Sequence, residues 1–458
     1  MKLAAVPLAC LFVSACHSIP GRQVGGPVFV PKDCPASLAQ ANTRCGSVAV
    51  PEDYSKRAGR QILLNVVVFN ALKPGYGDAA QFDLEGGPGF AVTDSAEFYA
   101  GDGAMYREHR DLVLADMRGT GGSEALRCPG LEQYEKTNAL APIYPPTLVA
   151  DCAALLASYA DLRFYSTAAA ARDIDAVREA LGYRSLDLNA VSYGTTLALR
   201  YIADFPDRVR TAVLMGTVPA KRTPPRYHAR AAEEGFMLLL QLCQTDPACA
   251  SAYPHPAADL ERSLTRMDAA QRAIFLEKIR TLLYAPASAR TLPAYLRDAA
   301  NGGVATPSAS TEGRQFADGL YLSITCSESI ARMDLEKAIA DSDATRFGAY
   351  RLQRQRDACA RWPIAAADPE LFEQPVSNVP VLFISGALDP VTPSQWTVEV
   401  AARFPRSRHV IVPQGAHVLE GLSGMDTCLD RVVPQFVEKG SADDIDMTCF
   451  AGMQAPFK

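Results

Sequence analysis

Ser192 lies in a sequence pattern that is typical of the nucleophile turn of a hydrolase. The segment LDLNAVSYGTTLALRY, residues 186–201, runs from an apolar stretch through Ser192 into a helix-like pattern. A turn this tight needs small residues two before and two after the serine, and these are Ala190 and Gly194. A serine hydroxyl is a weak nucleophile, so it needs a base and an acid that orients the base. The alternative is an ordinary strand-to-helix turn. Whether the sequence also offers a base and an acid for Ser192 distinguishes these two interpretations.

Candidates for both partners follow two later apolar runs. Asp389 comes after the run at 381–384, in a turn set by Pro390, and His417 comes after the run at 409–412. These positions predict that Asp389 orients His417 and that His417 takes the proton of Ser192. None of the other five histidines follows a comparable run; they are His17, His109, His228, His255 and His409.

Acyl transfer also needs hydrogen-bond donors for the developing oxyanion, and one such donor lowers the barrier by about 3–4 kcal/mol. The segment LEGGPGF, residues 84–90, places Gly86, Gly87 and Gly89 directly after an apolar run. Glycines let the backbone present N–H groups close to a substrate. We expect these glycines and the N–H group of Tyr193 to form the oxyanion hole.

Short apolar runs rich in β-branched residues predict the strands that position these groups. Helical patterns alternate with them, and one is well marked, with Thr167 as N-cap and Gly182 at the C-cap. A second helix follows Ser192 and should end at Pro206. The alternation predicts an α/β fold with a mostly parallel sheet covered on both faces. The predicted strands are 62–71, 79–87, 111–119, 186–192, 210–218, 379–386 and 408–415.

The chain changes character over residues 220–372, where helical patterns replace strand-like runs. A proline- and arginine-rich segment, PAKRTPPRYH, leads into this part. We expect a helical cap over the carboxyl edge of the sheet, where open α/β folds bind ligands.

The ordered motifs carry a resemblance to a known family. GGPG at 86–89, VSYG at 191–194 and GAH at 415–417 are joined by DMRGTGGS at 116–123 and GALDPVTP at 386–393. With these motifs the chain resembles the exported α/β-hydrolase serine peptidases of the prolyl iminopeptidase and tripeptidyl aminopeptidase family. Two further segments look like the exported tripeptidyl aminopeptidase branch: CGSVAVPEDY (45–54) and CQTDPACASAYP (243–254). Ala190 in place of the first elbow glycine and Glu85 before the oxyanion glycines depart from the pattern.

The resemblance implies an α/β-hydrolase core in two parts, 45–219 and 373–458, around the cap at 220–372. Residues 17–44 then form an N-terminal linker with the first disulfide region. The implied activity is an aminopeptidase that releases N-terminal residues or tripeptides from short peptides, without a metal or organic cofactor. A carboxylesterase with the same triad is the alternative, and a non-catalytic binding protein is a third.

The resemblance also implies that Asp116, Arg118 and Gly119 form a loop beside the oxyanion turn. We expect an Asp116–Arg118 pair that braces the glycines, and direct contact of these residues with the substrate is the alternative. An aminopeptidase must bind a free α-amine, and carboxylates in a partly desolvated pocket do this well. The cap offers Glu328, Glu233 and Glu234 for the amine.

The N-terminus reads MKLAAVPLACLFVSAC, with a positive Lys2 and an apolar run too short to span a bilayer. Its end, Val13 to Cys16, resembles the bacterial lipobox. We expect a lipoprotein signal peptide over residues 1–16, a lipidated Cys16, and a protein anchored at the periplasmic face or cell surface. A plain secretory signal and a buried first helix are the alternatives.

Ten cysteines follow the signal, an even number that indicates disulfides in an exported chain. A zinc site is the rival, but the sequence has no C-x-x-C motif. Spacing alone does not fix the connectivity, and neighbour pairing is our hypothesis. It gives Cys34–Cys45, Cys128–Cys152, Cys243–Cys249, Cys326–Cys359 and Cys428–Cys449.

The net charge of −6 argues against nucleic acid as a partner, because the sequence has no basic stripe to neutralise phosphates. We therefore expect a peptide substrate, a membrane contact through the lipid anchor, and a monomer.

Overall fold

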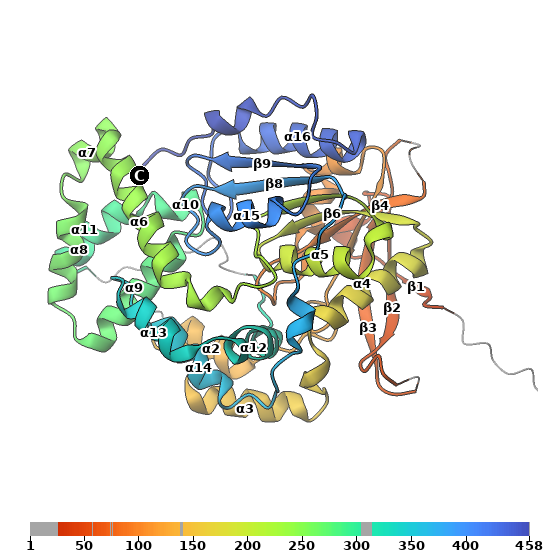
Figure 1. The fold of residues 1–458 in the computed structure, drawn as a ribbon, viewed down its shortest axis with the longest axis horizontal. Coiled ribbons are helices and arrows are strands. Elements are labelled where there is room, and N and C mark those ends of the chain that lie inside the picture. The colour runs from red at the N-terminus through yellow and green to blue at the C-terminus, as the bar shows by residue number, and fades with distance from the viewer. Residues whose placement is uncertain are drawn as a thin grey trace, which may run out of the picture.

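The protein is described by a computed structural model of residues 26–457, apart from 57, 74, 76, 138–140 and 304–313. Within these residues nine strands form one sheet, in the order β1-β2-β3-β5-β4-β6-β7-β8-β9 (Figure 1). The first four strands in this order pair antiparallel, and every pair from β5 onward is parallel. The strands are β1 (Phe29–Lys32), β2 (Thr43–Pro51), β3 (Gln61–Phe69), β4 (Ala79–Leu84), β5 (Asp111–Ala115), β6 (Ser185–Val191), β7 (Val209–Met215), β8 (Val381–Gly386) and β9 (Ser407–Val412).

The helices of the described residues divide into two groups. One group precedes β7 or follows β8 in the chain: α1 (Ala96–Ala100), α2 (Pro129–Thr137), α3 (Pro146–Ala157), α4 (Thr167–Leu181), α5 (Tyr193–Asp204), α15 (Ser394–Ala401) and α16 (Met425–Lys439). The other lies between β7 and β8: α6 (His228–Thr245), α7 (Pro247–Ala252), α8 (Pro256–Thr265), α9 (Ala269–Leu282), α10 (Pro286–Ala289), α11 (Leu292–Ala300), α12 (Asp318–Ile324), α13 (Leu335–Asp343) and α14 (Tyr350–Cys359).

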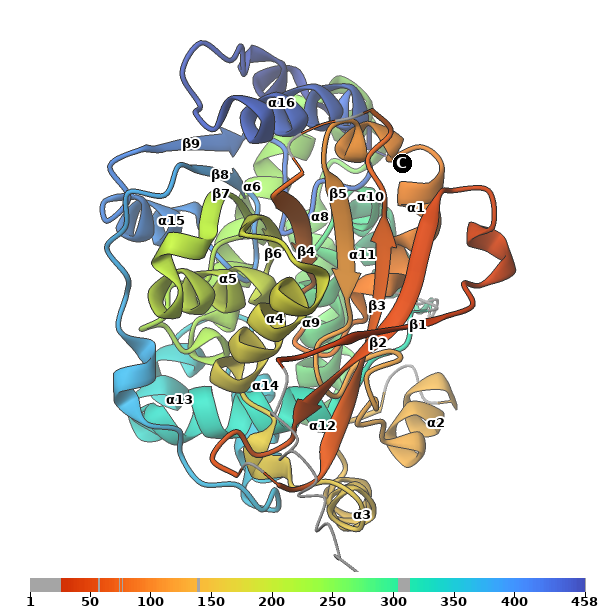
Figure 2. The same ribbon diagram turned by 90° about the vertical axis from the view of Figure 1, so that its right-hand side faces the viewer.

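Successive strand residues point to opposite faces of the sheet, and each face has its own apolar core. Ala212 and Leu214 of β7 pack on the face covered by α4 and α5, whereas Val213 packs on the face covered by α16. At the antiparallel end, β1, β2 and β3 face the viewer in Figure 2. All residues of β4 and β8 are buried, which explains their continuous apolar sequences.

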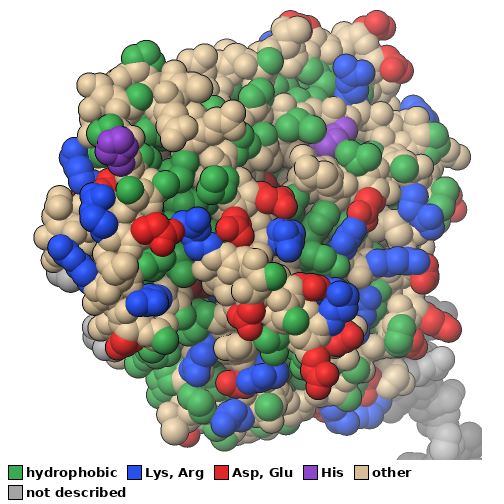
Figure 3. Space-filling view, turned by 60° about the vertical axis from the view of Figure 1, so that its left-hand side comes forward, with side chains coloured by type: hydrophobic (Ala, Val, Ile, Leu, Met, Phe, Trp, Pro, Cys, Tyr) green, Lys and Arg blue, Asp and Glu red, His purple; other side chains and the backbone are tan. Residues whose placement is uncertain are grey.

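The helices between β7 and β8 lie to the left and along the bottom of Figure 1. Five of them, α6, α8, α9, α10 and α11, share an apolar cluster of their own. Leu388 and Ala416 belong to this cluster, so the neighbours of Asp389 and His417 pack against the helical segment. The face in Figure 3 carries acidic and basic side chains intermixed with apolar ones.

All seven predicted strands form, and α5 ends at Asp204, before Pro206. The predicted linker at 17–44 is wrong in part, because β1 and the start of β2 lie within it. Neither β1 nor β2 was predicted. The edge strand β1 is mostly exposed, and β2 mixes buried and exposed residues, so neither shows a continuous apolar run in the sequence. The N-cap of α4 is Ser166, and Thr167 is the first helical residue.

The five disulfides of the structure join the predicted neighbour pairs: Cys34–Cys45, Cys128–Cys152, Cys243–Cys249, Cys326–Cys359 and Cys428–Cys449. The predicted signal peptide and Cys16 lie outside the described residues. Within the residues that are described, no helix has the length and apolar character that crossing a bilayer requires.

Candidate active site

Ser192 lies in a strained turn between β6 and α5. Its backbone has φ 56° and ψ −123°, a conformation that non-glycine residues rarely adopt. Gly194 is required there, since a Cβ at this position would lie 2.1 Å from the carbonyl oxygen of Leu84. Ala190 is buried in β6, where its methyl group belongs to the core under α4 and α5. The sheet therefore accommodates alanine in place of the first elbow glycine.

The structure brings the three predicted triad residues into one hydrogen-bonded chain. His417 Nε2 lies 2.8 Å from Ser192 Oγ, and His417 Nδ1 lies 2.9 Å from Asp389 Oδ2. Asp389 follows β8 and His417 follows β9, so parallel strands carry all three residues to the same edge of the sheet. This is the geometry in which an imidazole can take a hydroxyl proton.

Asp389 is fixed by donors from its own turn. The N–H groups of Val391 and Thr392 both donate to its Oδ1 at 2.8 Å, and Thr392 Oγ1 donates to its Oδ2 at 2.6 Å. The ring of His417 meets Tyr284 edge-on, with the ring centroids 5.3 Å apart. Both triad partners of Ser192 are buried, and their orientation is set on more than one side.

The predicted oxyanion turn lies against Ser192. A Cβ at Gly86 would come within 3.0 Å of Ser192 Cβ, and Gly87 has φ 111°. Tyr193 is the first residue of α5, so its N–H has no acceptor within the helix. The N–H of Gly86 differs, because it donates to the side-chain Oε1 of Glu85 at 2.9 Å.

Gly89 is not among the residues that line the cavity at Ser192, which corrects the prediction that it belongs to the oxyanion hole. Its carbonyl oxygen instead accepts the N–H of Ala317 at 3.0 Å, and Phe316 packs against it. Gly89 therefore joins the turn to the helical segment, while Gly86, Gly87 and Tyr193 face the cavity.

A cavity of about 480 Å³ lies between the sheet edge and the helical segment. This is within the usual size of small-molecule and peptide pockets. Ser192 and His417 line it, as do side chains from α6, α9, the turn after α12, and α14. The acidic side chains among its lining residues are Glu85, Glu135 and Glu328, and the basic ones are Arg222, Arg280, Arg314, Arg332 and Arg351.

Of the three glutamates predicted to bind an amine, Glu328 alone lines this cavity. Thr167 donates to both of its oxygens, from the backbone N–H at 2.8 Å and from Oγ1 at 2.6 Å. The hydroxyl of Tyr193 lies 2.8 Å from the same Thr167 oxygen. Burial raises the pKa of Glu328, and the Thr167 hydrogen bonds and the nearby Arg332 and Arg200 oppose the rise.

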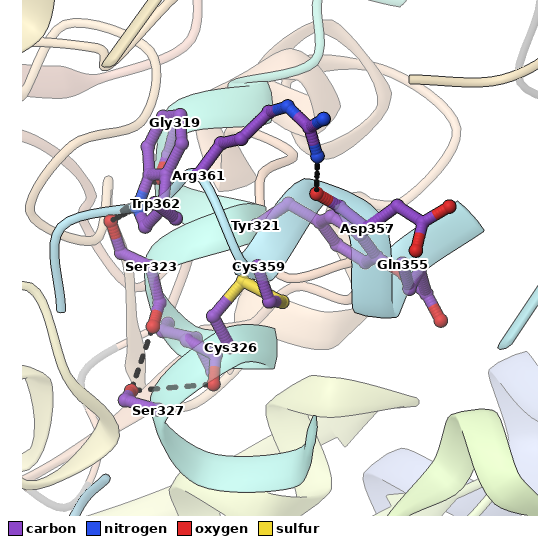
Figure 4. The surroundings of a disulfide bond; sticks show 11 residues. Gly319, Tyr321, Ser323, Cys326, Ser327, Gln355, Asp357, Cys359, Arg361 and Trp362 are labelled. Carbon is purple, nitrogen blue, oxygen red and sulfur yellow. Dashed lines mark hydrogen bonds between the residues drawn. A yellow bond between two sulfur atoms is a disulfide. The ribbon is translucent and has the colours of Figure 1, made fainter. Parts of the chain in front are cut away.

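Glu328 is placed by a π-helical turn, Thr325–Ser329, that continues α12. The disulfide Cys326–Cys359 ties this turn to α14 (Figure 4). Trp362 Nε1 donates to Ser323 Oγ at 3.1 Å, and Ser327 Oγ donates to the Ser323 carbonyl at 2.7 Å. Covalent and polar links therefore hold the turn that carries Glu328.

The prediction for Glu233 and Glu234 is wrong. Both lie on α6 but on its outer side: Glu233 pairs with Arg346, and Glu234 is exposed. Neither lines the cavity at Ser192. The sequence shows that a residue is a glutamate and that it lies in a helix. It does not show which face of that helix meets the sheet, because tertiary packing decides this.

The predicted Asp116–Arg118 pair is also wrong. Arg118 is fully buried and forms a two-pronged pair with Asp173 of α4, at 2.6 Å on each side. Asp116 instead accepts hydrogen bonds from Thr93, Asn65 Nδ2 and the N–H of Gly122. The two residues brace the loop separately, because their side chains point to different elements.

Sequence reasoning missed a group of cavity residues on the helical segment: His228, Arg280, Tyr284 and Arg351, with Glu277 behind them. They come from α6, α9, the turn after α9, and α14, and no local motif joins them. In the described part of the chain, no three His, Cys, Asp or Glu residues cluster as a metal site would require.

Comparison with known proteins places the chain in a family. A family model for the alpha/beta hydrolase fold matches residues 84–419. This is well over half of the chain, and the chain belongs to the α/β-hydrolase fold family. The predicted fold class and family resemblance are confirmed, and the protein is a hydrolase.

Three relatives illustrate the activities found among similar chains. The chain is 26% identical to a tripeptidyl aminopeptidase of Streptomyces lividans, over 89% of this chain and 83% of that one. It is 25% identical to the serine protease Hip1 of Mycobacterium tuberculosis, over 88% and 87% of the two chains. It is 26% identical to a carboxylesterase B of the same species, over 98% and 96%. A solved proline iminopeptidase of Mycobacterium smegmatis superposes with a TM-score of 0.42 at 17% identity, over 86% and 98%.

Proposed function

We propose that this hydrolase is an exported, lipid-anchored serine aminopeptidase that releases N-terminal residues or tripeptides from short peptides. The observation that carries the proposal is the hydrogen-bonded chain Ser192–His417–Asp389 in a cavity that also holds the buried carboxylate of Glu328. Relatives named tripeptidyl aminopeptidase and serine protease support the peptidase assignment.

In the proposed reaction Ser192 Oγ attacks the scissile carbonyl carbon while His417 Nε2 takes the hydroxyl proton. Asp389 holds the other ring nitrogen and stabilises the imidazolium. The N–H groups of Gly87 and Tyr193 stabilise the oxyanion of the tetrahedral intermediate. The intermediate collapses, the C–N bond breaks, and His417 gives its proton to the leaving amine. Water, deprotonated by His417, then hydrolyses the acyl-enzyme and regenerates Ser192.

Glu328 is the proposed partner of the substrate's free α-amine. It lines the same cavity as Ser192 and is buried, so an ammonium group there would meet a carboxylate screened from water. An N-blocked peptide carries no charge at this point and would lose that interaction. This difference would let the enzyme act at peptide N-termini.

A carboxylesterase is the second candidate, because the relative named carboxylesterase B matches 98% of the chain. Amide and ester cleavage both pass through a tetrahedral intermediate, so the triad serves either. A non-catalytic binding protein is disfavoured by the complete triad.

A substrate panel tests these alternatives. Purified protein is given aminoacyl and tripeptidyl amides with a free amine, their N-acetylated counterparts, and short acyl esters, with Ser192→Ala as the blank. We expect free-amine amides to have the highest kcat/KM. Cleavage of esters alone would favour the esterase, and failure of a fluorophosphonate to label Ser192 would favour the binding protein.

The lipid anchor is proposed from the Val13–Cys16 motif alone. In a bacterial host with lipoprotein processing, the wild-type protein should incorporate a radiolabelled fatty acid and sediment with membranes. Cys16→Ala should do neither. Equal membrane association of both forms would overturn the anchor without affecting the proposed activity.

A further inference from the structure

A cluster of charged side chains forms the cavity wall opposite the sheet edge. Glu277 of α9 accepts hydrogen bonds from Arg280 Nε at 2.9 Å and Arg280 Nη2 at 2.6 Å, and from Arg351 Nη1 of α14 at 2.6 Å. Burial alone would raise the pKa of Glu277, but the two guanidinium groups outweigh it and lower the pKa to about 2. The guanidinium groups of Arg280 and Arg351 therefore share the single negative charge of Glu277, so this group of three carries a net positive charge.

Other charged groups do not cancel this excess. Glu135 of α2 also lines the cavity, but it lies near Lys278 of α9 as well as near Arg351. Glu132 also lies near Glu135, but it pairs with Arg127. Counting that pair as neutral, the three cations Arg280, Arg351 and Lys278 stand against the two carboxylates of Glu277 and Glu135. The excess charge lies in a wall where Arg280 is only 3% exposed, so solvent screens it weakly.

His228 supplies a second, independent observation about the same wall. Its side chain lines the cavity at 6% exposure, and neither ring nitrogen has a hydrogen-bond partner among the described residues. Arg351 Nε is likewise buried without a partner there. Buried polar atoms are almost always paired, and these three unpaired atoms belong to two residues that line the cavity.

Protonation of His228 is disfavoured. Burial lowers the pKa of its imidazole well below the usual value, and the nearby Arg280, Arg351 and His417 lower it further. The neutral ring keeps one N–H donor. The positive charge of the wall therefore comes from the arginines, and His228 contributes a neutral hydrogen-bond donor.

The cluster is close to the reacting groups but separate from Glu328. Arg280 Nη1 donates to the hydroxyl of Tyr284 at 2.9 Å, and the Tyr284 ring meets the ring of His417. The cations nearest Glu328 are Arg332 and Arg200, whereas those nearest His228 are Arg280 and Arg351. Different cations therefore lie near Glu328 and near His228, and we call the group of Arg280, Arg351 and His228 the basic wall.

We propose that Arg351, Arg280 and His228 form a subsite that binds a carboxylate carried by the substrate. Arginine presents paired donors that match a carboxylate, and the open donors of His228 and Arg351 add to them. The carboxylate belongs either to the C-terminus of a short peptide or to an acidic side chain. The inference deepens the proposed function and, for its peptide substrates, rests on it.

The test compares substrates that differ by one carboxylate. The first pair is a peptide with a free C-terminus and the same peptide with a C-terminal amide. The second is an amidated peptide with Glu or Gln at one position. A third pair, the p-nitrophenyl ester of a dicarboxylic half-acid and of its methyl-capped form, needs no peptide cleavage. We expect kcat/KM to be about tenfold higher for the carboxylate member of the ester pair and of at least one peptide pair.

Two variants assign the effect to the subsite. Arg351→Met should remove most of the preference, measured as the ratio of kcat/KM between the two members of each pair. His228→Leu breaks no hydrogen bond of the structure, so it should fold and should also weaken the preference. Arg222→Met is the matched control, because Arg222 lines the same cavity but pairs with Glu399.

The outcomes separate the two proposals. No carboxylate preference in any pair, or a preference that persists in both Arg351→Met and His228→Leu, would overturn the subsite. A carboxylate preference in the peptide pairs supports the subsite, whether or not the esters share it. The first peptide pair then reports binding of the C-terminal carboxylate, and the second reports binding of an acidic side chain. Preference in the ester pair with no cleavage of any peptide would support the subsite and overturn the aminopeptidase.

Discussion

The hydroxyl of Thr392 lies between the two buried triad partners, 2.6 Å from Asp389 Oδ2 and 3.2 Å from His417 Nδ1. Thr392 therefore fixes the carboxylate that in turn fixes the imidazole. The motif GALDPVTP contains this residue, but its role depends on a turn that folds the hydroxyl back onto Asp389.

Thr392→Val should lower kcat/KM about tenfold, because one donor to a buried carboxylate is lost while two backbone donors remain. Steady-state kinetics on the best substrate measure this. Thr397→Val is the control: it removes a buried hydroxyl that lies 2.9 Å from Ser385 Oγ, outside the triad. Equal activity losses in both variants would show that Thr392 acts only through stability.

Gly86→Ala should reduce kcat about 10- to 100-fold, because the added methyl group would displace Ser192 from its attack geometry. The new Cβ would lie 3.0 Å from Ser192 Cβ and 3.5 Å from its Oγ. Gly130→Ala on α2 is the matched control, since its Cβ would meet only Leu148 at an ordinary 3.6 Å. Unchanged kcat in Gly86→Ala would contradict the position of the oxyanion turn.

Glu328→Gln should raise KM about tenfold for free-amine substrates and much less for N-blocked ones, because it removes a buried negative charge. In the wild type, KM for free-amine substrates should rise as the pH falls through the raised pKa of Glu328, since the protonated acid no longer attracts an ammonium group. Glu234→Gln makes the same change on the exposed face of α6 and should alter neither KM. An equal rise of KM for both substrate types in Glu328→Gln would contradict the proposal that Glu328 binds the substrate amine.

Loss of the Cys326–Cys359 disulfide should destabilise the protein and disturb amine binding together. The bond closes a loop with a sequence separation of 33, and replacing both cysteines by alanine should lower the free energy of unfolding by about 3–4 kcal/mol. KM for free-amine substrates should rise, because the bond anchors the turn that carries Glu328. The Cys243–Cys249 pair, with a separation of 6, should cost about 2 kcal/mol and leave KM unchanged. An unchanged KM in the first variant would mean that packing alone holds Glu328.

Asp83 should make stability depend on pH. Burial raises its pKa to about 6, although hydrogen bonds from Tyr99, Asn189 and Gln81 oppose the rise. Between pH 3.8 and about 6 the folded protein holds a proton that the unfolded chain has released, so the free energy of unfolding falls as the pH rises through this window.

Asp83→Asn should remove this pH-dependent change in the free energy of unfolding, which amounts to about 3 kcal/mol at most. Urea titrations between pH 4 and 7 measure it: the stability of the variant relative to the wild type should improve as the pH rises. Asp78→Asn, at a side chain that is 65% exposed, should run parallel to the wild type. Parallel curves for Asp83→Asn as well would refute the raised pKa.

The sequence by itself determined the triad and seven of the nine strands of the described residues. Both depend on local patterns: a buried parallel strand is a continuous apolar run, and a residue directly after such a run is delivered to the carboxyl edge of the sheet. Ser192, Asp389 and His417 each follow a run of this kind, so they could be named although they lie far apart in the chain. The disulfide pairs match the neighbour-pairing hypothesis, although spacing alone did not fix them. Strands β1 and β2 were not predicted because their partly exposed residues leave no such run.

Only the tertiary structure decided which side chains of the helical segment face Ser192. Glu328 lines the cavity, while Glu233 and Glu234 lie on the outer side of α6, although all three look alike in sequence. The basic wall is assembled from three helices that no local motif links. A helix can turn any of its faces toward a partner, and that choice is made by the packing of distant apolar residues rather than by the residues beside the charge.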